Sequence, residues 1–416
     1  MNVGMVSTRF AGTDGVSLET AKLAEVLESE GHQVVWFAGE LGKRFRPGIT
    51  CPLAHFEHPI NRRLEAAFFR GEAAPPYMMA TLRALTWKLK KALRQFLAEF
   101  DVDVVVAQNV LCLPMQLPLG VALSETLTET GLPAVGHHHD FGWERDRFSN
   151  GHDPRLLHSN FPPALPNLRH MVIQSAAKQE LRRRKGLDAT VLPNVMDFER
   201  GPATAPDGDA FRAAAGLNGR DLVLLQPTRV VPRKSIETTL QLAHELADPA
   251  VKVVVTHDDG DEGPDYGRFL RSEAERLDVD LRFVPTRAEP ADSSDRPLLA
   301  DAYGAANLVA YPSLIEGFGN ALLEALFYRC PVLVNRYPVY ARDIGPTGLR
   351  CIEIDDCVVT PEAVKEAAAC LENPDAWQAV VDRNYEICLG AFSYRVIRER
   401  FLPLLPCRSA ELAEVG

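Results

Sequence analysis

Two carboxylates lie at a fixed spacing in the most informative stretch of the sequence, residues 311–334. Glu316 and Glu324 are eight positions apart, and residues 317–319 form a turn that leads into a helix beginning near Asn320. The unpaired N–H groups of a helix N-terminus suit a diphosphate, and a glycine lets a ligand approach the backbone closely. Both carboxylates can accept hydrogen bonds from sugar hydroxyls. The alternative interpretation is a surface loop with solvated acids, and periodicity alone does not separate the two.

This stretch resembles the EX7E element of the retaining glycosyltransferases called group 1, or family 4. The resemblance includes the preceding residues YPS and the following residues ALFYRCPVLV. It implies a GT-B fold, in which two Rossmann-like doubly wound domains face each other across a cleft. It also implies that Glu316 faces the donor sugar and that Glu324 binds the nucleotide ribose. The backbone at Phe318, Gly319 and Asn320 would hold the donor sugar or its β-phosphate.

Two cations follow the apolar run at residues 222–226. Arg229 and Lys234 come directly after the end of this predicted strand, where they can neutralise a pyrophosphate leaving group. Members of the family show a similar pattern of arginine and lysine on the diphosphate, and Arg233 is an additional base. The alternative is a solvated loop, since lysine and arginine are usually surface residues.

Three consecutive histidines, residues 137–139, follow a short apolar run. A metal site is disfavoured, because neighbours on an extended chain point in different directions and no carboxylate has ligand spacing. In the resembling family, a strand that leads out of a proline ends in one histidine that lies against the donor sugar. Counting from Pro133, the best match is His139, with His138 as the adjacent candidate. Alternatively, these histidines satisfy backbone groups of the loop.

The loop at residues 8–18 departs from the family pattern. Family members usually carry a pair of glycines here, close to the donor phosphate and the acceptor, whereas this chain has Gly12 and then Gly15. We expect Gly15 to keep the close backbone approach and Ser17 to cap the following helix. Asp14 is a candidate contact for an acceptor hydroxyl. The departure bears on the class of acceptor more than on the reaction.

The resemblance implies a hexosyltransferase that moves a sugar from a nucleotide diphosphate to an acceptor hydroxyl with retention of configuration. The leaving diphosphate itself would help to deprotonate the acceptor. Further departures at residues 192–198 and 253–260 point to a less common branch, which we associate with small acceptors such as glycerate or a glucosylglycerate. The alternatives are a nucleotide-sugar epimerase of GT-B fold and a non-catalytic nucleotide-sugar-binding protein. UDP, GDP and ADP sugars are all compatible with the motif.

The resemblance also implies that no metal and no cofactor is needed beyond the nucleotide-sugar co-substrate. A strand followed by a metal-binding aspartate pair would argue otherwise. The aspartates Asp258, Asp259 and Asp261 superficially resemble such a pair, but they belong to a polar loop. The sequence therefore predicts a metal-independent transferase.

The elements that must position these residues alternate in type along the chain. Short apolar runs and helical patterns follow one another, as expected for a parallel α/β sheet. Strands are predicted at 2–7, 33–37, 102–107, 134–136, 171–174, 190–192, 222–226, 251–256, 280–284, 308–311 and 332–334. Helices are predicted at 17–30, 81–100, 117–130, 236–246, 319–327 and 375–405. A further helix is predicted after the strand at 171–174 and runs through Arg184.

The polar stretch at residues 201–209 reads as a linker between two such domains. We therefore assign residues 1–200 to an N-terminal Rossmann-like domain on the acceptor side. Residues 201–385 form a C-terminal Rossmann-like domain for the nucleotide-sugar donor. Residues 386–416 form a C-terminal helix that packs back on the first domain.

Composition and charge exclude several classes of protein. The chain has 416 residues and a formal net charge of -11, so a nucleic-acid partner is not expected. Eight scattered cysteines without a CxxC pair, no leader-like N-terminus and no long apolar stretch indicate a cytoplasmic protein. The basic helical pattern at 81–97 contains Trp87 and is compatible with peripheral membrane contact. A helix that packs its leucine face on the sheet is the favoured interpretation.

Overall fold

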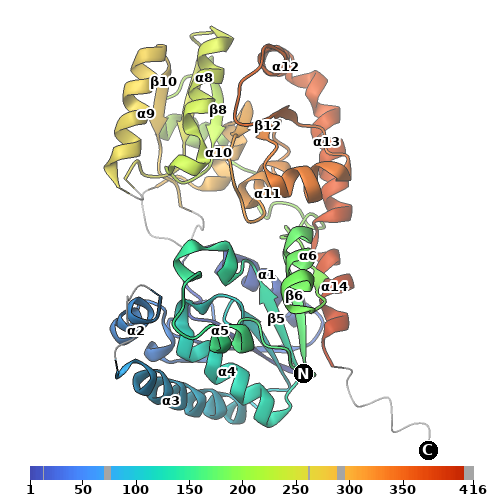
Figure 1. Ribbon diagram of the computed structural model, residues 1–416. Helices are drawn as coiled ribbons and strands as arrows, with labels where there is room; N and C mark the ends of the chain where they lie inside the picture. Colours follow the sequence, from blue (N-terminus) through green and yellow to red (C-terminus); the bar gives the residue numbers. More distant parts are fainter. Residues whose placement is uncertain (13, 70–75, 261–262, 288–295, 407–416) are drawn as a thin grey trace, which may run out of the picture. The chain divides into compact units, whose positions relative to one another are not determined.

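The computed structural model describes residues 1–12, 14–69, 76–260, 263–287 and 296–406. The chain forms two compact units (Figure 1). Unit 1 comprises Met1–Pro193 together with the chain from Arg395 onward, and unit 2 comprises Asn194–Tyr394. Each unit is built around one parallel sheet.

The sheet of unit 1 has seven strands in the order β3-β2-β1-β4-β5-β6-β7, and every neighbouring pair is parallel. The strands are β1 (Asn2–Val6), β2 (Gln33–Ala38), β3 (Gly48–Thr50), β4 (Val104–Gln108), β5 (Ala134–His138), β6 (Leu168–Val172) and β7 (Thr190–Val191). The helices are α1 (Gly15–Ser29), α2 (Pro59–Phe69), α3 (Met78–Glu99), α4 (Leu117–Thr130), α5 (Pro154–Asn160) and α6 (Ser175–Lys185). Strand β4 is buried along its whole length, as expected for a parallel sheet covered on both faces.

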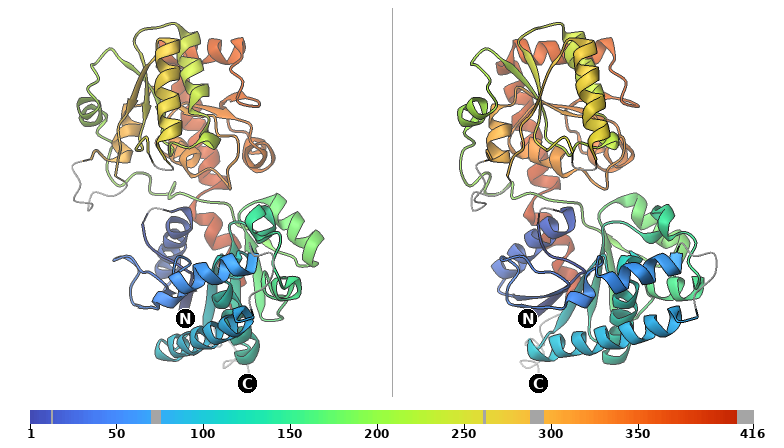
Figure 2. Two further views of the ribbon diagram at one scale, coloured as in Figure 1. Left: turned by 60° about the vertical axis from the view of Figure 1, so that its left-hand side comes forward. Right: turned by 90° about the vertical axis from the view of Figure 1, so that its left-hand side faces the viewer.

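Helices α3 and α4 lie side by side on one face of this sheet (Figure 2). Leu89, Leu93 and Phe96 of α3 pack there against strand residues such as Val105. Trp87 points away from this core and is 65% exposed. The leucine face of α3 is therefore buried on the sheet, as the favoured interpretation required.

The sheet of unit 2 has six strands in the order β10-β9-β8-β11-β12-β13, again all parallel. The strands are β8 (Leu222–Gln226), β9 (Val251–Val255), β10 (Asp280–Phe283), β11 (Leu308–Tyr311), β12 (Val332–Asn335) and β13 (Ile352–Ile354). The helices are α7 (Gly208–Ala214), α8 (Ile236–Leu246), α9 (Pro264–Leu277), α10 (Leu299–Ala305), α11 (Asn320–Phe327), α12 (Pro361–Glu372) and α13 (Pro374–Ala391). Apolar side chains of α8, α9 and α12 form one core with the sheet. The predicted class, two doubly wound α/β domains, is confirmed.

The helix predicted at residues 375–405 is not continuous, which corrects that prediction. Helix α13 ends at Ala391, and a separate helix α14 covers Tyr394–Arg400. Phe392 leaves the helical conformation with φ -137° and ψ 22°. Its carbonyl accepts a bond from Met196 N at 2.9 Å, and its buried ring lies 5.8 Å from that of Phe318. These tertiary contacts lie at the end of the helix, two residues after Gly390.

Helix α14 and the described chain that follows it are tied to unit 1 by hydrogen bonds from three arginines. Arg398 bonds Glu30 at 2.8 Å, and Arg400 donates to the Val191 carbonyl at 2.9 Å. Arg169 of β6 donates to the Pro403 carbonyl at 2.8 Å. The last described residues therefore belong to the first compact unit.

The polar stretch at residues 201–209 is not a linker throughout. Asp207 caps α7 by accepting a bond from Ala210 N at 2.9 Å, so the helix begins at Gly208. A side chain at Gly208 would meet the Gly304 carbonyl oxygen at 2.5 Å, because α7 packs closely against α10. None of the described helices is long and apolar enough to cross a membrane. Seven cysteines are free thiols, and Cys407 lies outside the described residues.

Candidate active site

Glu316 and Lys234 contact each other at the carboxyl edge of the unit 2 sheet. Lys234 follows β8 and Glu316 follows β11, which are neighbouring strands, so their side chains meet at one edge. The Lys234 Nζ donates to Glu316 Oε1, and both side chains are about one-tenth exposed, 9% and 10%. The ammonium also lies 5.6 Å from the centre of the Tyr311 ring. The structure thus brings two of the predicted site residues into one ion pair.

Burial and charge act on this pair in opposite senses. Burial raises the pKa of Glu316, but Lys234 and Arg233 more than offset it, and the pKa lies below its ordinary value. Burial also lowers the pKa of Lys234, and Glu316 restores only part of the difference. The carboxylate therefore stays ionised at neutral pH and can accept hydrogen bonds.

Two arginines complete a cationic group around this pair. Arg233 Nη1 lies 3.4 Å from Glu316 Oε2. Arg229 is exposed and lies near enough to Lys234 to lower the pKa of that ammonium further. Two cations, Lys234 and Arg233, therefore contact the Glu316 carboxylate, and a third, Arg229, lies near Lys234.

The turn before α11 is fixed by a glycine and a tyrosine. Gly319 has φ 129°, and a side chain there would meet the Tyr337 hydroxyl at 2.3 Å. That hydroxyl donates to the Phe318 carbonyl at 2.7 Å. Asn320 begins α11, and its side-chain oxygen accepts a bond from Asn194 Nδ2 at 2.6 Å. The backbone expected to hold the donor is thus fixed in a conformation that only glycine adopts without strain.

Glu324 lies on α11 and contacts a buried tyrosine. Tyr303 of α10 donates its hydroxyl to Glu324 Oε2 at 2.8 Å. The Tyr328 ring stacks on Tyr303 with a centroid distance of 5.0 Å. Burial raises the pKa of Tyr303, and the Glu324 carboxylate raises it further, so the hydroxyl remains a donor. The two glutamates of the spaced pair therefore have separate partners within unit 2.

His139 lies in unit 1, at the carboxyl end of β5. Its backbone N–H donates to Asn109 Oδ1 at 2.8 Å, and its Nε2 lies 3.2 Å from Gln108 Oε1. Burial lowers its pKa to about 4, although the nearby Asp140 and Asp14 act to raise it. The imidazole is neutral at physiological pH. With Gln108 Oε1 as acceptor, Nε2 carries the proton and Nδ1 is unprotonated.

The two preceding histidines point to opposite faces of the sheet. His138 is fully buried, and its Nε2 lies 3.0 Å from Nδ1 of His170. His137 is 2% exposed, and its ring centre lies 4.2 Å from that of His139. Neither ring nitrogen of His137 has a hydrogen-bond partner among the described residues. Of the two histidines proposed from the sequence, His139 rather than His138 faces the side shared with Gln108.

The loop between β1 and α1 corrects one expectation. The cap of α1 is Asp14, not Ser17: Asp14 Oδ1 accepts from Ser17 N at 3.1 Å, and Ser17 Oγ donates to Oδ2 at 2.8 Å. Asp14 is extended, so the helix begins one residue later, at Gly15. Gly15 is exposed, whereas Gly12 has the left-handed φ of 69°. The N-cap of α1 thus lies three residues before the predicted one, at an aspartate, which is a residue type that favours the N-cap position.

The aspartates that follow β9 are paired with arginines. Asp259 lies 2.6 Å from Arg271, and Asp258 lies 3.1 Å from Arg296. Asp261 lies outside the described residues. Within the ranges that the structure describes, no group of three or more His, Cys, Asp or Glu side chains could hold a metal ion.

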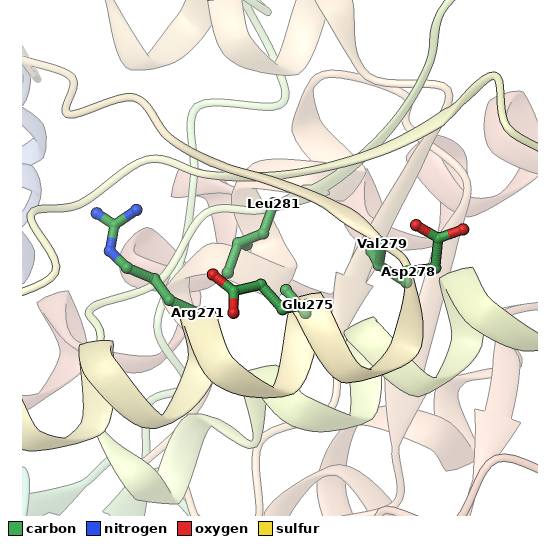
Figure 3. A pocket seen from close by; sticks show the side chains of 6 residues that line it. Arg271, Glu275, Asp278, Val279 and Leu281 are labelled. Carbon is green, nitrogen blue, oxygen red and sulfur yellow. The ribbon is translucent and has the colours of Figure 1, made fainter.

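An open hollow of about 340 Å³ lies between α9 and the edge strand β10 (Figure 3). Arg271 and Glu275 project from α9 toward it, and Asp278 stands where the helix ends. None of the predicted site residues lines this hollow. It is therefore separate from the grouping at the carboxyl edge of β8 and β11.

The sequence pattern missed the partners that hold the predicted residues. Tyr303 and Tyr337 carry no motif, because each bonds a residue about twenty positions away in the sequence. Asn194 lies within the departure at residues 192–198, but nothing in that pattern predicts its bond to Asn320. Arg233 was noted only as an additional base. The apolar context of Tyr303 was the one available signal, and it predicts a core tyrosine rather than a contact of Glu324.

Comparison with known proteins defines the class. Residues 13–200 match Glycosyltransferase Family 4, and residues 207–369 match Glycosyl transferases group 1. A mannosylglucosylglycerate synthase of Thermotoga maritima is 30% identical over 425 residues, covering 94% of this chain and 97% of the relative. The same enzyme of Petrotoga mobilis is 30% identical over 379 residues, covering 85% and 86%.

Solved structures share the fold at low identity. A glycosyltransferase of Rickettsia africae has a TM-score of 0.69 at 11% identity, covering 100% of this chain and 99% of that one. The Anabaena protein HepE, solved in complex with UDP-glucose, has a TM-score of 0.66 at 15% identity, covering 96% and 97%.

The two parallel sheets and the similar solved structures show that the chain has the GT-B fold. The chain belongs to the group 1 glycosyltransferases.

Proposed function

We propose that this chain is a retaining, metal-independent hexosyltransferase that uses a nucleoside-diphosphate sugar and a small polar acceptor. The observation that carries the proposal is the grouping of Lys234 and Glu316 at the carboxyl edge of the unit 2 sheet. Ligands of parallel α/β sheets bind at this edge. The complex of Anabaena HepE with UDP-glucose supports a nucleotide sugar as the donor.

In unit 2, the donor diphosphate is bound by the cations that follow β8. An ammonium has three N–H donors, so Lys234 can bond a phosphate oxygen while Glu316 holds it in place. Arg229 supplies a second positive charge as the diphosphate leaves. Glu316 orients the donor sugar, and Glu324 binds the ribose hydroxyls. The backbone from Phe318 to Asn320 lies against the sugar or its β-phosphate.

In unit 1, His139 contacts the donor sugar and the loop at Gly15 receives the acceptor. A neutral imidazole with an unprotonated Nδ1 can accept a hydrogen bond from a sugar hydroxyl. It does not place a second positive charge beside the developing oxocarbenium ion. Its role is to orient the sugar rather than to transfer a proton.

The reaction forms one bond and breaks one. The acceptor oxygen bonds the anomeric carbon on the face from which the diphosphate departs, and the bond from that carbon to the phosphate oxygen breaks. The acceptor proton passes to the leaving diphosphate. The products are a glycoside of unchanged configuration and a nucleoside diphosphate, whose charge Arg229 and Lys234 stabilise.

The acceptor class follows from the two relatives that match nearly the whole chain. Both are named for making mannosylglucosylglycerate. We therefore propose a glycosylated glycerate, such as glucosylglycerate, as the acceptor and mannose as the first sugar to test. This is the class of acceptor that we associate with the departures at residues 192–198 and 253–260.

The test is a transfer assay with purified protein. UDP-, GDP- and ADP-hexoses are each incubated with glucosylglycerate, and the product is read by NMR. We expect one donor to give a glycoside with the anomeric configuration of that donor. An inverted product would contradict retention. Conversion of the donor to an epimer without acceptor would favour the epimerase, and donor binding without turnover would favour a non-catalytic protein.

A further inference from the structure

Arg9 stands three residues beyond β1, at the carboxyl edge of the unit 1 sheet. Its Nη2 lies 3.0 Å from Asp14 Oδ2, and its guanidinium carbon lies 5.5 Å from the centre of the Phe56 ring. The side chain is 33% exposed. The guanidinium is therefore held on two sides while a third of it still faces solvent.

Arg9 has unused hydrogen-bonding capacity. A guanidinium carries five N–H donors in a planar fork, and Asp14 takes one of them. Within the described residues, Arg9 forms no other side-chain hydrogen bond. Asp14 is already shared, because it also accepts from the backbone N–H and the hydroxyl of Ser17. A second carboxylate can therefore bind the open part of the fork without displacing Asp14.

Asp14 places this arginine beside the proposed reaction site of unit 1. Its carboxylate lies near enough to His139 to raise the pKa of that imidazole against the larger, lowering effect of burial. Next to Phe56, the His55 ring stacks on the Phe56 ring with a centroid distance of 4.7 Å, and its Nε2 lies 3.4 Å from a carboxylate oxygen of Glu40. The loop thus carries one cation between carboxylates and rings, at the place where the acceptor is expected.

We propose that Arg9 binds the carboxylate of an anionic acceptor and so selects acidic acceptors over neutral ones. This inference rests on the proposed function, and it identifies the acceptor carboxylate as the group that the N-terminal loop binds. The chain has a formal net charge of -11, so an anionic acceptor needs a local cation to bind here. Asp14 holds the guanidinium in place and accepts a hydrogen bond from an acceptor hydroxyl.

A purely structural role of Arg9 makes a different prediction. If the ion pair with Asp14 only ties the loop to α1, its loss affects all acceptors alike. If Arg9 binds the acceptor carboxylate, substitution of Arg9 affects only acceptors that carry a carboxylate. Two acceptors that differ at this group alone therefore separate the two roles.

The test compares glucosylglycerate with glucosylglycerol, in which a neutral CH₂OH replaces the carboxylate. Their kcat/KM values are measured for the wild-type chain and for Arg9→Gln with the donor at saturation. We expect Arg9→Gln to lower kcat/KM for glucosylglycerate roughly 10- to 100-fold, as for the loss of a hydrogen bond to a charged group. The value for glucosylglycerol should stay close to wild type. Arg9→Lys keeps the charge but not the planar fork of donors, so its kcat/KM for glucosylglycerate should lie between those of the wild-type chain and Arg9→Gln.

Arg184→Gln is the matched control. Arg184 also pairs with a carboxylate, Glu180 at 2.7 Å, and lies 5.5 Å from an aromatic centre, that of Trp143. It should leave the preference for glucosylglycerate unchanged. Thermal unfolding checks that Arg9→Gln is folded.

The outcomes separate the inference from the proposed function. Equal loss on both acceptors, or no loss on either, in a folded Arg9→Gln protein would overturn the role of Arg9 and leave the transferase reaction standing. No transfer by the wild-type chain to either acceptor, with any of the nucleotide sugars, would reject the proposed function and the inference with it.

Discussion

The hydroxyl of Tyr303 donates to a carboxylate oxygen of Glu324 at 2.8 Å, from a position that solvent does not reach. Tyr303 lies on α10 and Glu324 on α11, so the contact joins two helices of unit 2. This bond fixes Oε2 of Glu324 in place, and it thereby also fixes the orientation of the whole carboxylate group. A carboxylate held in this way is prepared to accept bonds from a pair of vicinal hydroxyls, which is what a ribose offers.

Tyr303→Phe should therefore weaken binding of the nucleotide and reduce its preference for ribose. We expect the dissociation constant of the matching nucleoside diphosphate to rise about tenfold, and that of its 2′-deoxy counterpart to rise less. Calorimetry with both ligands measures the ratio. Tyr328→Phe is the control, because its ring stacks on Tyr303 but its hydroxyl makes no bond within the described residues.

Glu324→Ala completes this test. It should weaken binding of the whole nucleotide sugar, since the ribose contact is lost outright. Unchanged affinity in Glu324→Ala would remove this residue from the site. Unchanged preference for ribose in Tyr303→Phe would make Tyr303 an ordinary core residue.

The ion pair of Lys234 with Glu316 predicts coupled losses of turnover. Lys234→Ala should lower kcat on the order of 10²-fold or more, because a charge partner of the leaving diphosphate is lost. Glu316→Gln leaves a buried ammonium without its partner and should also be severe. The fold-loss of kcat in the double variant should be smaller than the product of the two single fold-losses, since each change already disrupts the other residue.

Arg233→Gln provides the comparison for this pair. Its guanidinium contacts Glu316 from an exposed position at 3.4 Å, where an ion pair contributes little. Steady-state rates at saturating donor and acceptor measure all four variants. Near-normal turnover of Lys234→Ala would place Lys234 in a structural role.

Much of the fold could be predicted because strands of a parallel sheet are buried on both faces. The run at β11 is apolar throughout and the run at β8 is apolar up to Gln226, and the observed bounds of both strands equal the predicted ones. Helix α9 was missed because its exposed face is polar and only Gly267, Leu270, Ala274 and Leu277 are buried. The break at Phe392 was missed because its cause, the contact with Met196, is far away in the sequence.

The candidate site likewise contains residues that a sequence pattern can find and contacts that it cannot. Glu316, Glu324 and Gly319 follow one another within a short segment, so a pattern can find them. Tyr303 reaches Glu324 from 21 residues away, and the sequence gives no register between α10 and α11. The cap of α1 was misplaced because aspartate and serine both suit the position, and only the extended backbone of Asp14 decides between them.

Removal of metal ions should leave the transfer rate unchanged. In unit 2 the charge of the diphosphate is assigned to Arg229 and Lys234, and the aspartates Asp258 and Asp259 already have arginine partners. The assay is run after treatment with EDTA, and again with Mg²⁺ or Mn²⁺ added. A loss of activity that Mn²⁺ restores would show that a metal ion carries part of this charge.

Acid should destabilise unit 1 in a defined window of pH. Burial lowers the pKa of His139 and of His170 to about 4, and it lowers those of His137 and His138 as well. In the unfolded chain these histidines bind protons near their ordinary pKa of about 6.5. Their contribution to stability is therefore complete above pH 6.5 and is lost as the pH falls toward 4.

Unfolding by urea between pH 7.5 and 5.0 measures this effect. Below pH 6.5, each neutral histidine should lower the free energy of unfolding by about 1.4 kcal/mol per pH unit. His170→Gln removes one of these groups while an amide can still bond His138, so its slope should be shallower by one histidine. A free energy of unfolding that does not change over this range would mean that the buried histidines are protonated in the folded protein. The same neutrality predicts that His139 adds no titration step to kcat between pH 6 and 8.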